Sequence, residues 1–198
     1  MTRAGPRLRF YFDYLSPYAY LAHTQLLRLD HPIDYRPFDI RTLMPAVGNV
    51  PTSVICKPKN RYVQADLRRW VLHYGVPFAR NPQIMAIDHR RLLCATLLAA
   101  EGEDAGVVVS ALYAAMWGVP RPLGTAAEVA EVLATAGMTS ASVAADIDAS
   151  DQDEAVTRAT DEAVAHGVFG APTMFVGDEM FFGNDRLDFV RAALDRPE

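Results

Sequence analysis

Cysteine is scarce in this sequence. Among its 198 residues only Cys56 and Cys94 are cysteines, and no Cys-x-x-Cys motif occurs. A lone pair of this kind is more often two reduced thiols than a disulfide. We therefore expect both cysteines to be unpaired and to take no part in catalysis. The lack of paired thiols also argues against disulfide exchange as the activity.

Positive charge and long apolar runs are lacking as well. The formal net charge is −5, so a nucleic-acid backbone is not an expected partner. No segment approaches the roughly 18 uncharged apolar residues of a membrane-spanning helix. The basic start, residues 1–9, is followed by Phe10-Tyr11-Phe12-Asp13 and not by the apolar stretch of a signal peptide. We expect a cytoplasmic protein without membrane contact.

Metal ligands are not grouped along the chain. Its five histidines are scattered, and none repeats at a spacing typical of zinc sites. We therefore expect no metal centre. What the chain has in quantity is apolar side chains, at 51% against 22% charged, which is enough for a packed core.

The first forty residues carry a strand, a helix and a second strand. Residues 8–13 alternate and are rich in aromatic side chains, and residues 33–38 alternate again. Between them, apolar residues from Tyr18 to Leu29 follow the helical period. Three elements this close together predict a right-handed parallel βαβ unit.

The rest of the chain is helical until its last thirty residues. The amphipathic segments are residues 63–74, 88–101, 105–117, 126–136 and 151–166. Near the C-terminus, residues 172–176 and 179–182 read as strands around the turn Gly177-Asp178, and a helix follows over about 185–194.

This order predicts an α/β, thioredoxin-like fold (βαβ…ββα) with a large all-helical insertion. Residues 1–40 and 167–198 would form the thioredoxin-like domain, and residues 41–166 the inserted helical domain. No strand is expected between residues 41 and 166.

Ser16 stands where the first strand passes into the first helix. Serine is a natural N-cap, and Pro17 is a natural first helical residue. The helix end also presents free amide donors and the positive end of the dipole, where a serine hydroxyl could stabilise a bound thiolate. The residue type and position leave both roles open.

Two C-terminal segments have polar backbone that could bind a ligand. A cis Ala171–Pro172 bond would turn the Ala171 amide and carbonyl outward, so that an extended peptide could dock beside the next strand. In the segment 183–186, Asn184 or Asp185 either caps the last helix or binds the charged end of a ligand.

An irregular loop is expected over residues 48–62, at the entrance to the inserted domain. Asn49 could bond a peptide backbone, and Lys57, Lys59 and Arg61 could hold an acidic ligand or form a solvated face. Trp117 belongs either to the core or to a wall of the cleft between the domains.

Together and in this order, these segments resemble the 2-hydroxychromene-2-carboxylate isomerases and their relatives, the kappa-class glutathione transferases. Both belong to the DsbA-like branch of the thioredoxin superfamily, which carries a helical insertion. The matching pieces span nearly the whole chain: residues 10–18, Gly48-Asn49, Arg61-Tyr62, Asp66-Leu67, Trp117-Gly118, 168–173 and 183–187. The stretch from Val168 to Leu187 is the most specific and is closer to the isomerases.

The resemblance implies a bound glutathione and a homodimer. It implies that Ser16, next to Pro17, contacts the sulfur and that Ala171, before a cis Pro172, bonds the cysteinyl backbone. The γ-glutamyl end would be held by Phe182, Gly183, Asn184 and Asp185, and further contacts would come from Asn49 and Lys59.

The substrate side departs from what the resemblance implies. Polar or basic residues are expected near positions 44, 53–54 and 84, where this chain has Met44, Ser53, Val54 and Ile84. With Tyr62 and Trp117 they would line a more apolar pocket for an aromatic or electrophilic small molecule.

Three functions follow from these observations. The first is a glutathione-dependent isomerase of the 2-hydroxychromene-2-carboxylate isomerase type, and the second is a kappa-class-like glutathione transferase. The third is a non-catalytic thioredoxin-fold module that binds a peptide beside Pro172, with Ser16 only a cap.

Overall fold

The protein is described by a computed structural model that covers residues 7–29, 31–100, 105–138 and 143–196, without the side chains of Ser53, Val54 and Ser150. Its strands are β1 (Leu8–Phe12), β2 (Ile33–Pro37), β3 (Thr173–Val176) and β4 (Glu179–Phe182). Its helices, with a π-helical turn (η1) and a 3-10 turn (η2), are α1 (Pro17–Leu26), α2 (Ile40–Ala46), α3 (Thr52–Ile55), α4 (Lys57–Tyr74), α5 (His89–Ala100), α6 (Ala105–Tyr113), η1 (Ala114–Gly118), α7 (Ala126–Thr135), α8 (Val143–Ile147), α9 (Ser150–Ala165), η2 (Asn184–Arg186) and α10 (Leu187–Leu194).

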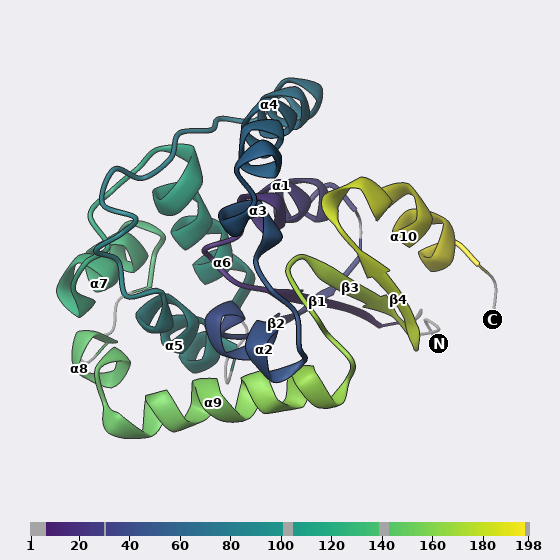
Figure 1. Ribbon diagram of the computed structural model, residues 1–198. Coiled ribbons are helices and arrows are strands. Elements are labelled where there is room, and N and C mark those ends of the chain that lie inside the picture. The colour runs from purple at the N-terminus through teal and green to yellow at the C-terminus, as the bar shows by residue number, and fades with distance from the viewer. Residues whose placement is uncertain (1–6, 30, 101–104, 139–142, 197–198) are drawn as a thin grey trace.

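The four strands form one mixed sheet in the order β2-β1-β3-β4 (Figure 1). β1 pairs in parallel with β2, Phe10 opposite Tyr35, and antiparallel with β3, Phe10 opposite Met174. β3 and β4 form the predicted hairpin around Gly177, whose φ is 59°. This sheet confirms the predicted thioredoxin-like fold, and the described residues between 41 and 166 contain no strand.

The two faces of the sheet are covered by different helices (Figure 1). One face presents Phe10, Phe12 and Met174 to the main core, which α1, α10 and several helices of the middle segment complete. The other face presents Tyr11 and Phe175 to a smaller cluster beneath α2 and α9. Alternation along β1 sends neighbouring aromatic side chains to opposite faces, as a strand buried on both sides requires.

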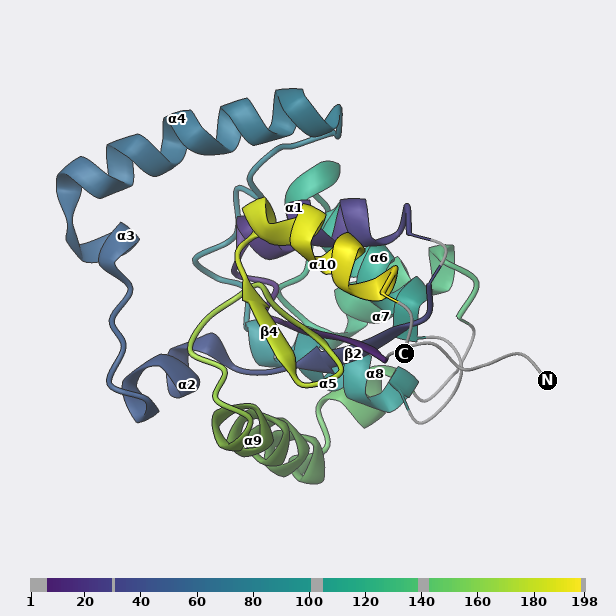
Figure 2. The same cartoon turned by 90° about the vertical axis from the view of Figure 1, so that its right-hand side faces the viewer.

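The main core runs across the predicted domain boundary. Leu92 on α5 and Val109 on α6 belong to the same buried cluster as Leu8 and Phe12 of β1. The division into residues 1–40 plus 167–198 and residues 41–166 therefore stays a prediction. The part of the insertion that stands apart is the arm of α3 and α4, which extends from the body (Figure 2) and in α4 buries only Leu67.

The expected irregular loop over residues 48–62 is wrong from Thr52 onward. α3 forms over Thr52–Ile55, and α4 begins at Lys57. Pro58 stands in the first turn of α4, where a missing amide hydrogen breaks no helical bond, so proline starts this helix instead of preventing it. None of the helices in the described residues is both long and apolar enough to cross a membrane.

Candidate functional site

Ser16 caps α1 and contacts a second segment of the chain. Its backbone is extended (φ −90°, ψ 108°), and its hydroxyl oxygen accepts the Ala19 amide at 3.2 Å. The same hydroxyl donates to the carbonyl of Ala171 at 3.1 Å. The capping role is therefore confirmed. The second bond joins the start of α1 to the segment before β3, two sites that the sequence analysis treated separately.

The segment before β3 has the predicted backbone. The Ala171–Pro172 peptide is cis. Ala171 is half-buried, and no acceptor for its amide N–H is found in the described part of the chain. A ligand carbonyl could accept this hydrogen bond, because a half-buried amide without a partner is a ready donor.

The turn after β4 is tied to the same place. The Gly183 amide donates to the Pro172 carbonyl at 3.0 Å. Gly183 has a φ of 98°, a backbone conformation that strains residues with a side chain, so glycine is favoured at this position. Neither Asn184 nor Asp185 caps a helix with its side chain. The capping explanation offered for these two residues is therefore wrong.

The side chains of this turn have separate surroundings. Asn184 is buried, and its carbonyl accepts the Tyr74 hydroxyl of α4 at 2.9 Å. Asp185 is exposed and pairs with Arg186. Phe182 is partly exposed, with its ring 4.6 Å from that of Phe169. The exposed Asp185 carboxylate could bind an ammonium group.

The insertion reaches the site through Asn49. Its side-chain amide donates to the Phe169 carbonyl at 2.8 Å, two residues before Ala171. Lys59 lies on the exposed arm, where it donates to Thr52. Asn49 is thus held at the segment before β3, whereas the hydrogen bond found for Lys59 among the described residues stays within the arm.

Helix α4 lies over the start of α1. The Tyr18 hydroxyl donates to Oδ2 of Asp66 at 2.9 Å, and the Tyr62 hydroxyl donates to Oδ1 of the same residue at 3.3 Å. Asp66 therefore joins the arm to the helix that Ser16 caps. This arrangement supplies a second wall beside Ser16.

The remaining predicted substrate residues are not gathered in one pocket. Met44 packs at the edge of the smaller cluster beneath α2 and α9, whereas Ile84 is buried in the main core. Trp117 is also in the core, where its ring nitrogen donates to the Tyr14 carbonyl at 2.7 Å. Tyr62 is exposed on α4, and the side chains of Ser53 and Val54 lie outside the described residues.

Both cysteines are free, as predicted. Cys56 is exposed at the start of α4, and Cys94 is buried on α5. Burial raises the pKa of the Cys94 thiol to about 11, so this thiol stays protonated at neutral pH. That neither thiol acts in catalysis stays a prediction.

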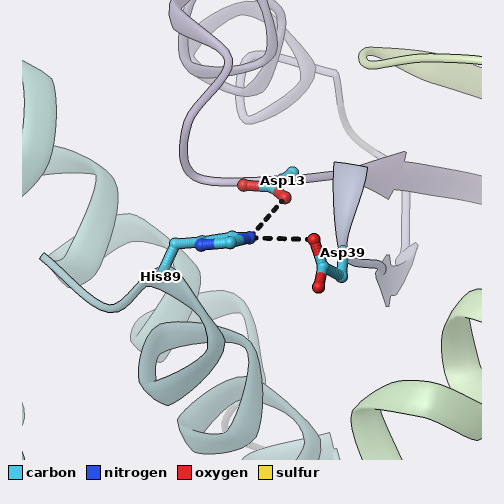
Figure 3. Close-up of side chains that lie close together, drawn as sticks. All are labelled: Asp13, Asp39 and His89. Atoms are coloured by element: carbon cyan, nitrogen blue, oxygen red, sulfur yellow. Dashed lines mark hydrogen bonds and ion pairs between the residues drawn. The ribbon is translucent and has the colours of Figure 1, made fainter. Parts of the chain in front are cut away.

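A buried ionic cluster that was not predicted from the sequence lies close to the start of α1 in the chain and joins Asp13, Asp39 and His89 (Figure 3). Asp13 follows β1, Asp39 caps α2 after β2, and His89 begins α5. Nε2 of His89 lies 3.0 Å from Oδ1 of Asp39 and 3.4 Å from Oδ2 of Asp13. All three side chains are at most 5% exposed. The cluster is thus a charged group inside the protein.

Both carboxylates of this cluster accept several hydrogen bonds. Asp13 accepts the amides of Leu15 and Ile40, each at 2.8 Å. Asp39 accepts two further amides, a threonine hydroxyl and the guanidinium of Arg90 at 2.9 Å. The three ligand atoms lie close enough for a metal ion. The arginine cation and the complete set of N–H donors nevertheless fit a hydrogen-bonded ion cluster better than a metal centre.

Burial and charge act against each other in the cluster. Burial raises the pKa of the Asp13 carboxyl, although the neighbouring His89 opposes this. Burial has the same effect on Asp39, but the hydrogen bond and charge of His89 outweigh it and hold the Asp39 pKa well below its usual range. Burial lowers the pKa of His89, but the hydrogen bond to Asp39 and the charge of Asp13 raise it above its usual value. The arrangement favours a protonated His89 beside an ionised Asp39.

One sequence signal could have indicated the two aspartates. Asp13 and Asp39 stand close after two strands of a predicted βαβ unit. The carboxyl ends of parallel strands meet at the same edge of a sheet, where side chains of this kind lie close together. No comparable signal existed for His89, which lies 50 residues beyond Asp39 in the chain.

The Ser16 side of the molecule carries groups that could bind an extended ligand with charges of both signs. The start of α1 supplies the positive end of a helix dipole, and Ala171 supplies a free amide. Asp185, on the η2 turn that contacts α1, supplies an exposed carboxylate. The Ser16 hydroxyl has one hydrogen, which Ala171 receives here. A bound thiolate would compete with that carbonyl for the same hydrogen.

Comparisons with known proteins identify the family of the chain. Residues 7–195 match the family model of the DSBA-like thioredoxin domain. A 2-hydroxychromene-2-carboxylate isomerase from Sphingobium xenophagum is 35% identical over 193 residues, covering 93% of this chain and 96% of the relative. Glutathione S-transferase kappa 2 from Caenorhabditis elegans is 26% identical, covering 96% of this chain and 92% of the relative.

A solved structure gives the same result. The structure of a 2-hydroxychromene-2-carboxylate isomerase has a TM-score of 0.84 at 31% identity, covering 94% of this chain and 93% of that one. The similarity is therefore greater to the isomerases than to the kappa transferase.

Proposed function

Because this chain belongs to the 2-hydroxychromene-2-carboxylate isomerase family of DSBA-like thioredoxin domains, we propose that it is a glutathione-dependent isomerase. Its substrate would be an aromatic or otherwise electrophilic small molecule. The observation that carries the proposal is the Ser16 hydroxyl, which caps α1 and lies 3.1 Å from the carbonyl of Ala171. Both the sulfur and the backbone of glutathione can thus be bound at one place.

The residues present fit glutathione. The free Ala171 amide can donate to the cysteinyl carbonyl, and the exposed Asp185 can accept the γ-glutamyl ammonium. The carboxylates of glutathione suit the Asn49 side and the basic arm that carries Lys59. When bound, glutathione supplies the thiolate that adds to an electron-poor carbon and leaves again after bond rotation, without net redox change.

Ser16 would keep the sulfur ionised. A free thiol has a pKa of about 8.5, and lowering it by about two units needs roughly 2.7 kcal/mol of preferential anion stabilisation. One charge-assisted hydrogen bond contributes about 1.5–3 kcal/mol, and the helix end adds about 0.3–1 kcal/mol. These two contributions are together large enough for the shift.

Calorimetry with reduced and oxidised glutathione tests the proposal. We expect the reduced form to bind at micromolar to millimolar concentration and the oxidised form to bind more weakly, because its second half meets the wall formed by α4. A protein that binds neither form, but binds extended peptides, would be the non-catalytic module and would overturn the proposal.

Ser16→Ala tests the role of the hydroxyl. Loss of the cap costs about 1 kcal/mol of unfolding free energy whichever role is correct. The discriminating result is the thiol pKa of bound glutathione, followed by thiolate absorbance near 240 nm, which we expect to rise by about 1–2 units. An unchanged thiol pKa would leave Ser16 as a cap only.

A kappa-class-like transferase is the second candidate, supported by the 26% identity to a kappa transferase over most of both chains. The two activities differ in their products, since a transferase leaves glutathione attached to the substrate and an isomerase releases it. Mass spectrometry of the products separates them.

We propose two further properties with the function. A homodimer is supported by the exposed apolar side chains on the α4 arm, among them Leu72 at 81% exposed, and size-exclusion chromatography tests it. A cytoplasmic location is supported by the two free cysteines.

A further inference from the structure

Asp13 holds the turn that leads to Ser16 with both its backbone and its side chain. Its carbonyl accepts the Ser16 amide at 3.1 Å, and Oδ1 of its carboxylate accepts the Leu15 amide at 2.8 Å. The Tyr113 hydroxyl also reaches the Asp13 carbonyl, at 3.3 Å. The position of the Ser16 hydroxyl therefore depends on where Asp13 is held.

His89 is the cation nearest to Asp13 among the described side chains. The Asp13 carboxylate is completely buried, so water cannot stabilise its charge. Its second oxygen, Oδ2, accepts the Ile40 amide at 2.8 Å and faces Nε2 of His89 at 3.4 Å (Figure 3). His89 in turn is fixed by Asp39 at 3.0 Å. The start of α5 thus contacts Asp13 at Oδ2, the carboxylate oxygen that does not accept from Leu15.

We infer that His89 is a positioning residue for Ser16, which it holds in place through Asp13. Protonated His89 keeps the buried Asp13 carboxylate ionised and oriented, and Asp13 fixes the Leu15 and Ser16 amides. No ligand has to touch His89 for this role. The effect on catalysis rests on the proposed function, whereas the effect on the Ser16 turn does not.

The charged groups around His89 support this assignment. Asp13 comes from the end of β1, and Asp39 and Arg41 belong to the start of α2. On α5, Arg90 bonds Asp39 and also Asp153 of α9. Arg91, also on α5, makes two partly exposed ion pairs. One is with Asp148, just after α8, and the other is with Asp88, just before α5.

These charges predict how the hold on Asp13 changes with pH. With His89 protonated, two buried carboxylates face His89 and Arg90. When His89 loses its proton, the same two carboxylates keep only the guanidinium, which contacts Asp39 and not Asp13. Because the pKa of His89 is raised, this loss occurs on the alkaline side of its usual value and weakens the hold on Asp13.

The first test needs no glutathione. In the unliganded protein, the NMR shifts of the Leu15 and Ser16 amides should change with pH at the apparent pKa of the His89 imidazole, because Asp13 accepts from both amides. In His89→Gln, which keeps a donor but cannot titrate, this change should vanish. Amides that stay constant while the His89 imidazole titrates would overturn the inference.

His23→Gln is the matched control, since it replaces another buried histidine by the same residue. His23 lies on α1, where its Nε2 pairs with Ser110 at 3.1 Å, and among the described residues it makes no hydrogen bond or ion pair with Asp13. The Leu15 and Ser16 shifts should titrate in this variant as in the wild type. If His89→Gln does not fold, the wild-type titration alone still decides between the two outcomes.

The second test uses glutathione and turnover. In His89→Gln we expect the thiol pKa of bound glutathione to rise by about one unit, because a displaced Ser16 hydroxyl would donate a weaker hydrogen bond to the thiolate. The wild-type pH profile of kcat/KM should fall on the alkaline side as His89 deprotonates, and His89→Gln should lack this limb. An unchanged thiol pKa and profile would overturn the link to catalysis.

Failure of the inference and failure of the proposed function give different results. If reduced glutathione does not bind the wild type, the proposed function fails, and the amide titration still decides the positioning role. If glutathione binds normally but the amides ignore His89, the positioning role alone fails.

Discussion

Two buried histidines of this protein carry opposite charge preferences. His23 on α1 and His89 on α5 are 2% and 3% exposed. Burial lowers the pKa of His23 to about 4, whereas the pKa of His89 is raised despite its burial. The two side chains are almost equally shielded from solvent, so solvent exposure does not explain the difference between their pKa shifts. The neighbouring groups must explain it.

The surroundings of His23 are aromatic and uncharged. Its ring packs against those of Phe10, Tyr35 and Tyr113, with centroids 5.4–6.3 Å away. Its Nε2 meets the Ser110 hydroxyl, which itself donates to the Gly106 carbonyl at 2.7 Å. Ser110 therefore accepts from Nε2–H, and a second proton on His23 would add an uncompensated charge in the core.

The surroundings of His89 contain the charge that His23 lacks. Two carboxylates within 3.4 Å of its Nε2 compensate the imidazolium. In both residues Nδ1 has no partner in the described part of the chain, so this nitrogen does not distinguish them. The comparison shows that the carboxylates near the carboxyl ends of β1 and β2, and not solvent exposure, separate the charged histidine from the neutral one.

Removing a carboxylate should have the largest effect. Asp39→Ala leaves His89 and Arg90 without their shared partner inside the protein, and a broken buried ion pair costs about 3–5 kcal/mol. We expect a loss of this size in the unfolding free energy, measured by urea denaturation at neutral pH.

Asp153→Ala is the control for this prediction. Asp153 also binds Arg90, but its side chain is 72% exposed, and exposed pairs contribute only about 0.2–1 kcal/mol. Equal losses in the two variants would show that the buried cluster is no more important than a surface pair.

His23 should make the protein less stable in acid. Its pKa is lowered in the folded state from 6.5 to about 4, so the unfolded chain takes up the proton first as the pH falls. Stability is then lost from about pH 6.5 downward, by on the order of 3 kcal/mol at pH 4. His23→Gln should lack this part of the loss in urea titrations between these pH values. A variant with the wild-type acid slope would contradict the assignment.

His89 should change the unfolding free energy with pH in the opposite direction to His23. Its pKa is raised in the folded state, so the folded protein binds the proton more tightly than the unfolded chain. The stability gained is complete below the unfolded pKa and is lost as the pH rises through the folded pKa. This loss should be smaller than that of Asp39→Ala, because burial offsets part of the ion pairing. Urea titrations of His89→Gln should show no such decrease; persistence of the decrease would assign it to another group.

The comparison also explains what the sequence could predict. Strands, long helices and the Ser16 N-cap depend on local patterns. They were predicted from residues 8–38, from the amphipathic segments of the middle and from residues 172–194, although the first turns of α4 were expected as loop. The short helices α2 and α8 were missed because a few residues give no period, and α2 also contains Pro45.

The parts of the candidate site that are formed by residues adjacent in sequence could be predicted. Ser16 with Pro17, Ala171 with Pro172, and the turn at Gly183 each have a local signature. The ionic cluster combines Asp13 and His89 from distant segments, so no window of sequence contains it. Trp117 shows the same limit, because its pairing with the Tyr14 carbonyl arises only from packing.

The smallest change should come from the partner of His23. Ser110→Ala removes the acceptor of Nε2–H, and an average hydrogen bond contributes about 0.5–1.5 kcal/mol to stability. His89 has two carboxylates facing its Nε2, whereas His23 has one hydroxyl. In Ser110→Ala the 15N shifts of the His23 ring should therefore report a mixture of the two neutral tautomers. Those of His89 should not change. Ser110→Thr keeps a hydroxyl and should preserve the wild-type tautomer of His23. Wild-type ring shifts in Ser110→Ala would mean that the aromatic surroundings alone select the tautomer, and that the hydroxyl contributes only its share of stability.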